Sequence, residues 1–157
     1  MASKFPRHGV GAEIGVLKGN FSAQLLRFAR PSRLHLVDPW MQKNGDAFYD
    51  RVCRRFAGKI ARGTVVVHRA RSTDAVDALE ELDWVYIDGN HTYEHVKEDL
   101  ASYHGIVKPG GVIAGDDYAM PGYPWGDGVR EAVDEFVRTH GYELIVRGHQ
   151  FIITKPR

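Results

Sequence analysis

The sequence has little of what disulfide-stabilised, membrane-spanning or nucleic-acid-binding proteins are built from. Its 157 residues include one cysteine, Cys53, so an intramolecular disulfide is excluded. No window approaches the 18 or more apolar residues of a membrane span, and the N-terminus lacks the apolar core of a signal peptide. Lys and Arg number 21 and Asp and Glu 20, so no overall field favours a polyanion. We expect a cytoplasmic protein with no nucleic acid and no membrane among its partners.

The chain has enough apolar material for one domain. With 157 residues, 43% of them hydrophobic, it is short for two ordinary domains and needs no disulfide or metal to fold. We expect a single domain over residues 1–157, with a minimal N-terminal extension over residues 1–8. The 17 glycines are notable, because glycine is usually kept for turns and for close approach of the backbone to a ligand.

Short apolar segments alternate along the chain with amphipathic ones. Their periodicity predicts strands over 10–16, 33–40, 64–70, 82–88 and 110–118. Between and after these strands it predicts helices over 20–29, 47–61, 72–82, 91–107 and 129–140. Asn20 or Ser22 is available to cap the first helix and Ser72 to cap the third, and the segment KPGG over 108–111 is expected to end the fourth. Two further strands, joined around Gly148, have the pattern of a hairpin. This order is typical of an α/β protein with a doubly wound, mostly parallel sheet and an antiparallel edge.

Carboxylates lie toward the carboxyl ends of four of the five expected parallel strands. Ligands of such sheets bind beyond the carboxyl ends of the strands, where the strand order reverses. An acidic rim of this kind is costly unless a cation or hydrogen-bond donors receive it, so it indicates a binding site. The acids are Glu13, Asp38, Asp88, and the adjacent Asp116 and Asp117.

The segment AEIGVLKGNFS joins the first expected strand to its helix. Gly15 allows a tight turn, and Gly19 allows a ligand to approach the helix N-terminus. The segment lacks the GxGxxG pattern of dinucleotide-binding proteins. With Asp38 closing the next strand, it suits a nucleoside whose ribose hydroxyls are held by that acid.

Four segments, in order and spacing, resemble the class I S-adenosylmethionine-dependent methyltransferases: AEIGVLKGNFS, LVDPW, VYIDGNHTYEHVKEDL and IVKPGGVIAGDDY. More narrowly, they resemble the macrocin-type metal-dependent O-methyltransferases. The resemblance runs from about residue 9 to residue 155. It implies a Rossmann-like sheet of seven strands in the order 3-2-1-4-5-7-6, with the C-terminal hairpin antiparallel.

The resemblance also implies a cofactor site for S-adenosylmethionine. Its residues would frame the methionine part (Glu13, Gly15 and Gly19), hold the ribose (Asp38), line the adenine side (Trp40) and meet the adenine edge (Ser72). Asp88 is expected to contact the cofactor too, and to take part in catalysis.

By the same resemblance, Asp88, Asp116 and Asp117 would bind a divalent ion. Three oxygen ligands without sulfur suit Mg²⁺ or another hard ion, which can lower the pKa of an acceptor hydroxyl. His91 is then the natural general base. The macrocin-type enzymes have an acid where this chain has Asn90, which leaves the choice between His91 and metal activation alone.

Other readings stay open. His91 and His95 are spaced like zinc ligands, but the HExxH pattern is missing. Asp117 could cap a helix, residues 118–128 could form a substrate lid or a plain surface loop, and the basic run over 51–62 suits a solvated helix face. The expected activity is O-methylation of a small hydroxylated acceptor of sugar or phenol type. The alternatives are a cofactor-binding domain without catalysis and a nucleotide-binding oxidoreductase. With a short extension before the first strand, we expect the site to be either open or completed by a second subunit.

Overall fold

Seven strands form one sheet in the computed structural model, which describes residues 1–120, 122 and 126–157. The strands are β1 (Val10–Ile14), β2 (Arg33–Val37), β3 (Val65–His68), β4 (Leu82–Ile87), β5 (Val107–Gly115), β6 (Leu144–Arg147) and β7 (Gln150–Thr154). Their order is β3-β2-β1-β4-β5-β7-β6. The first five run parallel, β7 runs antiparallel to β5, and β6 pairs antiparallel with β7. The expected α/β fold and strand order are confirmed.

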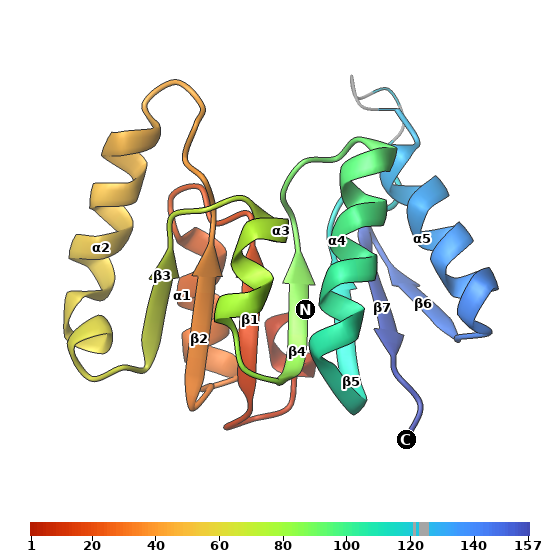
Figure 1. Ribbon diagram of the computed structural model, residues 1–157, viewed down its shortest axis with the longest axis horizontal. Coiled ribbons are helices and arrows are strands. Elements are labelled where there is room, and N and C mark those ends of the chain that lie inside the picture. The colour runs from red at the N-terminus through yellow and green to blue at the C-terminus, as the bar shows by residue number, and fades with distance from the viewer. Residues whose placement is uncertain (121, 123–125) are drawn as a thin grey trace.

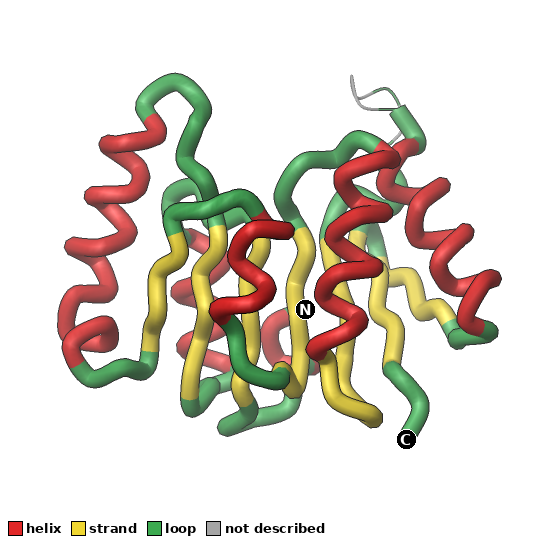
Figure 2. Tube along the Cα trace, viewed as in Figure 1, coloured by secondary structure: helices red, strands yellow, loops and turns green. Residues whose placement is uncertain are grey.

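Helices cover both faces of this sheet (Figures 1 and 2). They are the short η1 (Ala2–Lys4), then α1 (Asn20–Phe28), α2 (Gly45–Ala61), α3 (Ser72–Ala75), η2 (Val76–Ala78), α4 (Tyr93–Ile106) and α5 (Gly128–His140). Side chains of η1, α1 and α2 share one buried cluster, and those of α3, α4 and α5 share the other. In Figure 1, α3 and α4 accordingly lie in front of the sheet and α1 lies behind it.

The central strand β4 shows why the sheet sits between two apolar layers. Its side chains alternate, so Trp84 and Tyr86 face the cluster of α1 and α2 while Val85 and Ile87 face that of α4 and α5. All four are buried, and Phe5 stacks on Trp84 with ring centroids 4.4 Å apart. A strand buried on both faces reads as a continuous apolar run, which is the pattern of a parallel sheet.

Several expected element ends are wrong. We expected Asn20 or Ser22 to cap the first helix, but Gly19 is the cap, in the left-handed conformation, and no side chain caps it. Ser72 begins α3 instead of capping it, and that helix shortens to one turn followed by η2. The predicted helix over 91–107 begins at Tyr93, because the preceding residues form the loop that leaves β4.

The segment over 108–111 does not end the helix before it, as its Pro and Gly suggested. It lies inside β5, where the register with β4 shifts between the pairs Leu82–Val107 and Trp84–Val112. Gly110 has φ +80° and donates its N–H to the Lys155 carbonyl oxygen. Glycine and proline therefore mark a bulge here, which is the other common use of these residues in strands.

The structure also bears on membrane association. Within the described ranges, no helix combines the length and apolar character needed to cross a bilayer.

Candidate active site

A cavity of about 800 Å³ opens at the carboxyl ends of the parallel strands. Its walls come from the segments that follow β1, β2, β3 and β4, and from one side of α4. The strand order reverses between β1 and β4, so the cavity lies at the switch point where this fold class binds ligands. Its volume is in the range of sites for cofactors and small molecules.

Glu13, at the end of β1, is a buried acid in the wall of this cavity. It is 1% exposed, and its Oε2 atom has no hydrogen-bond partner among the described residues. Burial raises the pKa of Glu13 to about 8, and the neighbouring Ser22 lowers it in part. A buried acceptor without a donor is costly. The ammonium group of an amino-acid ligand would supply that donor.

Gly15 allows the ends of β1 and β4 to approach each other. It has φ +86°, and a Cβ atom added there would lie 1.9 Å from the carbonyl oxygen of Asp88. Glycine is therefore required both by conformation and by space. Gly15 lines the cavity, whereas Gly19 lies one turn further on, against Val52 and Phe56 of α2, and is not among the lining residues.

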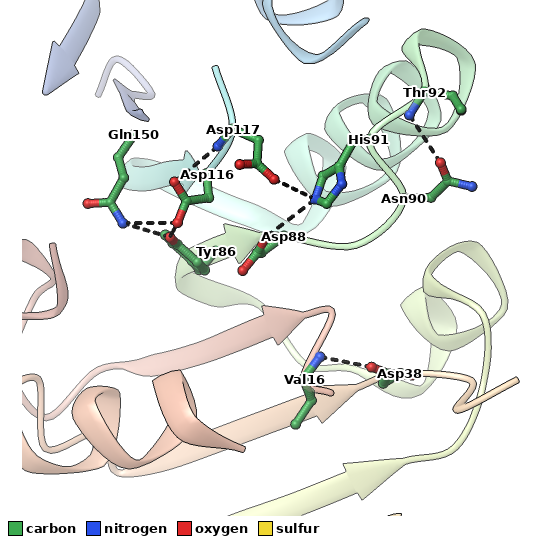
Figure 3. Close-up of polar contacts among 10 residues, drawn as sticks. All are labelled: Val16, Asp38, Tyr86, Asp88, Asn90, His91, Thr92, Asp116, Asp117 and Gln150. Atoms are coloured by element: carbon green, nitrogen blue, oxygen red, sulfur yellow. Dashed lines mark hydrogen bonds and ion pairs between the residues drawn. The ribbon is translucent and has the colours of Figure 1, made fainter. Parts of the chain in front are cut away.

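Asp38 holds the loop after β1, which lines the cavity, in place; Figure 3 shows its contact with Val16. Its Oδ2 atom accepts the backbone N–H groups of Val16, at 3.0 Å, and Leu17, at 2.9 Å, and its Oδ1 atom accepts that of Trp40 at 2.6 Å. The carboxylate also lines the cavity. Three donors leave about one lone pair of the carboxylate for a ligand.

Trp40 does not line the cavity, contrary to expectation. It is 2% exposed, belongs to the cluster of α1 and α2, and donates its indole N–H to the carbonyl oxygen of Leu17 at 2.8 Å. Pro39 and Met41, on either side of it, reach the cavity instead. The backbone of Trp40 has a φ of +48°, and its buried indole supports the loop that contains Leu17. Ser72, by contrast, lies in the cavity wall after β3, as expected.

Three titratable side chains meet near the end of β4. The Nε2 atom of His91 lies 2.9 Å from a carboxylate oxygen of Asp117 and 3.4 Å from one of Asp88 (Figure 3). Burial raises the pKa of each of these acids, and hydrogen bonding to Asp88 raises the pKa of His91. One ligand atom from each of the three lies within 4.8 Å of the others. Two carboxylate oxygens and one imidazole nitrogen are a donor set that fits a divalent ion.

Asp116 is turned to other partners. Its Oδ2 atom accepts the Tyr86 hydroxyl at 3.0 Å, and Gln150 of β7 donates to the same hydroxyl oxygen at 2.8 Å. Its Oδ1 atom accepts the backbone N–H of Asp117. The structure therefore brings Asp88 and Asp117 together with His91, and it holds the third expected metal ligand at the side of this group (Figure 3).

Asn90 and His95 both make their hydrogen bonds with Thr92, the residue that precedes α4. The Oδ1 atom of Asn90 accepts the backbone N–H of Thr92 at 3.0 Å, and the Thr92 hydroxyl lies 2.8 Å from Nδ1 of His95. His95 is absent from the cluster around His91, so among the described residues no group of three ligand side chains contains both histidines. The expected lid over 118–128 includes residues 121 and 123–125, which lie outside the described part of the chain.

Sequence reasoning missed Tyr86, Gln150 and Asp99. Tyr86 occurs where a strand predicts core residues, so nothing in the local pattern marks it as a polar partner of the site. Asp99, however, is a charged residue at a buried helical position, and that conflict was a usable signal.

The comparison with protein families decides the identity. A family model described as a methyltransferase domain matches residues 12–118, which run from within β1 to beyond the end of β5 and include every expected site residue. The chain belongs to this methyltransferase family. Its sheet has the strand order of the class I S-adenosylmethionine-dependent enzymes, so the methyltransferase has their fold.

Solved structures share this fold at low sequence identity. A precorrin-6y methyltransferase from Geobacter metallireducens is 18% identical, with 99% of this chain and 83% of that chain covered and a TM-score of 0.74. A protein described as a caffeoyl-CoA O-methyltransferase, from Staphylococcus aureus, is 12% identical, with 98% and 77% covered and a TM-score of 0.73. A Streptococcus mutans protein solved with S-adenosylhomocysteine is 12% identical, with 98% and 92% covered and a TM-score of 0.71.

A curated relative gives a shorter match. An uncharacterized protein of Acanthamoeba polyphaga mimivirus is 39% identical over 56 residues, which are 36% of this methyltransferase and 24% of the viral protein. The methyltransferase thus matches about a quarter of that relative's length.

Proposed function

We propose that this protein transfers the methyl group of S-adenosylmethionine to a hydroxyl of a small sugar-like or phenolic acceptor, with the help of a divalent ion. The observation that carries the proposal is the cavity, which has a buried unpartnered acid, Glu13, at one part of its wall and a His-carboxylate cluster at another. The first suits an amino-acid cofactor, and the second suits proton transfer from a hydroxyl.

The cofactor residues are assigned by their place in the cavity. Glu13 would receive the cofactor ammonium, and Asp38 would accept a ribose hydroxyl with its remaining lone pair. Gly15 keeps the wall open for the methionine part, and Ser72 meets the base. When bound, the cofactor supplies an electrophilic methyl group on a sulfonium.

His91 is the proposed general base. As a neutral imidazole it would take the proton of an acceptor hydroxyl, and Asp88 and Asp117, which lie 3.4 and 2.9 Å from its Nε2 atom, would stabilise the imidazolium that forms. The acceptor oxygen then bonds to the methyl carbon as the carbon–sulfur bond breaks, and the electron pair of that bond stays on sulfur. The cavity only has to hold oxygen and methyl group in line.

Asp88 and Asp117 are the proposed oxygen ligands of a divalent ion such as Mg²⁺. Bound there, the ion would add positive charge that lowers the pKa of a nearby acceptor hydroxyl. We propose Asp116 as the third acid, on the macrocin-type resemblance, although it would have to exchange its contacts with Tyr86 and Gln150. In the structure the side chain that meets Asp88 and Asp117 is His91, the proposed base.

A small acceptor also suits the cavity mouth. Leu17 and Met41 line the cavity and are 49% and 73% exposed, so they offer apolar contacts to a ring or to a second subunit that covers the site. We place the protein in the cytoplasm, since Cys53 is free, and we propose neither nucleic acid nor membrane as a partner.

A methyl-transfer assay tests this proposal. Purified protein is incubated with methyl-labelled S-adenosylmethionine and a panel of sugars and catechols, with Mg²⁺ or with EDTA. We expect a labelled product with at least one hydroxylated acceptor, formed faster with Mg²⁺ and lost in His91→Ala. Cofactor binding without transfer to any acceptor would favour the non-catalytic alternative.

A further inference from the structure

A buried acid on α4 lies in the cavity wall and has no role in the account so far. Asp99 is 3% exposed and lines the cavity together with Ser72 and Thr73. Its Oδ2 atom lies 3.9 Å from the position that a Cβ atom would take on Gly89, at the start of the loop after β4. The Asp99 side chain therefore extends from α4 toward the turn that leads from β4 into the site.

Two residues of α4 fix the cavity wall at Ser72. The buried Tyr103 donates its hydroxyl to the backbone carbonyl oxygen of Ser72 at 2.9 Å. The Ser72 side chain is near enough to Asp99 to lower the pKa of that carboxyl. Ser72 is thus held through its backbone by Tyr103, and its side chain is a neighbour of Asp99.

The Asp99 carboxylate keeps the capacity to accept from a ligand. Burial raises the pKa of Asp99 to about 6, while hydrogen bonding to Ser72 lowers it, so the group is ionised at pH 8. An ionised carboxylate only accepts hydrogen bonds and offers about four acceptor positions. One serine hydroxyl fills at most one of these, and a buried charge is stabilised by each further donor.

The proposed cofactor leaves one part of the cavity for its base. Its ammonium is assigned to Glu13, its ribose to Asp38, and its methyl group must face Asp88 and His91. The remaining wall is formed by 71–73, by the loop after β4, and by the side of α4 that carries Asp99. This step rests on the proposed function, because it takes S-adenosylmethionine as the ligand.

We propose that Asp99 determines the specificity for the purine base, with its carboxylate accepting the exocyclic 6-amino group of adenine. The 6-amino group is a donor, whereas a 6-oxo group is an acceptor that would face the carboxylate with no proton between them. A buried site built to accept from one substituent rejects an analogue that cannot donate, because the site group is left unpaired.

The test compares S-adenosylhomocysteine with S-inosylhomocysteine, its 6-oxo analogue, by titration calorimetry at pH 8. For the wild-type protein we expect the adenine compound to bind at least about tenfold more tightly, which corresponds to about 1.4 kcal/mol. A preference below threefold in the wild-type protein overturns the proposal without the need for any variant.

Asp99→Asn and Glu98→Gln form a matched pair of variants. The amide at position 99 can donate to a 6-oxo group, so we expect Asp99→Asn to reduce the preference for adenine about tenfold. Glu98 also lines the cavity from α4 but is exposed, so Glu98→Gln should leave the preference unchanged. If Asp99→Asn does not fold, Ser72→Ala, which removes the neighbour that orients the carboxylate, should reduce the preference about threefold.

The outcomes separate this inference from the proposed function. If the wild-type protein binds neither compound, both are wrong. If it binds S-adenosylhomocysteine well and folded Asp99→Asn keeps the wild-type preference, the role of Asp99 is wrong and the cofactor assignment stands. Equal changes in Asp99→Asn and Glu98→Gln would attribute the effect to charge and would also contradict the proposal.

Discussion

The two ends of the cavity are built differently. At the cofactor end, Asp38 accepts three backbone N–H groups and fixes the loop, and Glu13 is buried. At the acceptor end, Asp88 and Asp117 are partly exposed and are brought together by the imidazole of His91. The first end is organised by the fold itself. The second is an arrangement of like charges that a cation, whether imidazolium or metal, stabilises.

The largest effect is expected at the cofactor end. Asp38→Ala removes the acceptor of three backbone N–H groups, so the loop after β1 loses its position. We expect a loss of about 3 kcal/mol in the free energy of unfolding and at least about 100-fold weaker binding of S-adenosylhomocysteine. Denaturant unfolding and calorimetry measure the two quantities. Wild-type affinity in this variant would show that the loop is not fixed by Asp38.

A second substitution tests the acceptor end alone. Asp117→Asn removes a charged oxygen ligand, and we expect about 100-fold weaker Mn²⁺ binding by electron paramagnetic resonance, with unfolding free energy and cofactor affinity nearly unchanged. Asp116→Asn is the matched variant and should cost less than tenfold, because that carboxylate is held by Tyr86 and Gln150. Equal losses in both variants would show that all three acids bind the ion.

The ionisation of Glu13 sharpens the contrast through pH. Its pKa of about 8 means that it is mostly protonated at pH 7, and a cationic ammonium favours the ionised form. S-adenosylhomocysteine should therefore bind about tenfold more tightly at pH 8.5 than at pH 7, with proton release on binding at pH 7. Glu13→Gln should abolish this dependence. A flat profile in the wild-type protein would place the ammonium elsewhere.

The smallest effect concerns the hydrogen bond from Tyr86 of β4 to Asp116, beside the acceptor end of the cavity. Tyr86→Phe removes the hydroxyl that holds Asp116, so that acid is free to turn toward Asp117. We expect about threefold tighter Mn²⁺ binding and a loss of about 1 kcal/mol in stability. If Mn²⁺ binding instead weakens, the tyrosine supports the ion site as it stands.

Much of the fold could be predicted from the sequence, because its signals are local. The apolar run of β4 and the hairpin around Gly148 each predict their element from a few residues. The strand order came from the resemblance to known methyltransferases, and the structure confirms it. The Pro and Gly residues of 108–111 were misread, since the same residues serve a helix end and a strand bulge.

The site could be predicted only as far as chain position determines side-chain direction. Glu13 lies at the carboxyl end of β1, and Asp38 and Asp88 directly follow β2 and β4, so the sheet brings all three to one edge. The direction of Trp40 depends on a positive φ, and that of Asp116 depends on Tyr86 and on Gln150 from the far hairpin. Such contacts between segments distant in the chain have no local pattern, so the sequence could not separate Asp116 from Asp117.

The most direct test of this account is calorimetric titration of the wild-type protein with S-adenosylhomocysteine in the presence of EDTA at pH 8. A cofactor end organised by the fold should bind one equivalent with a micromolar or lower dissociation constant without any metal. Absence of binding at about 1 mM ligand by folded protein would contradict the central claim.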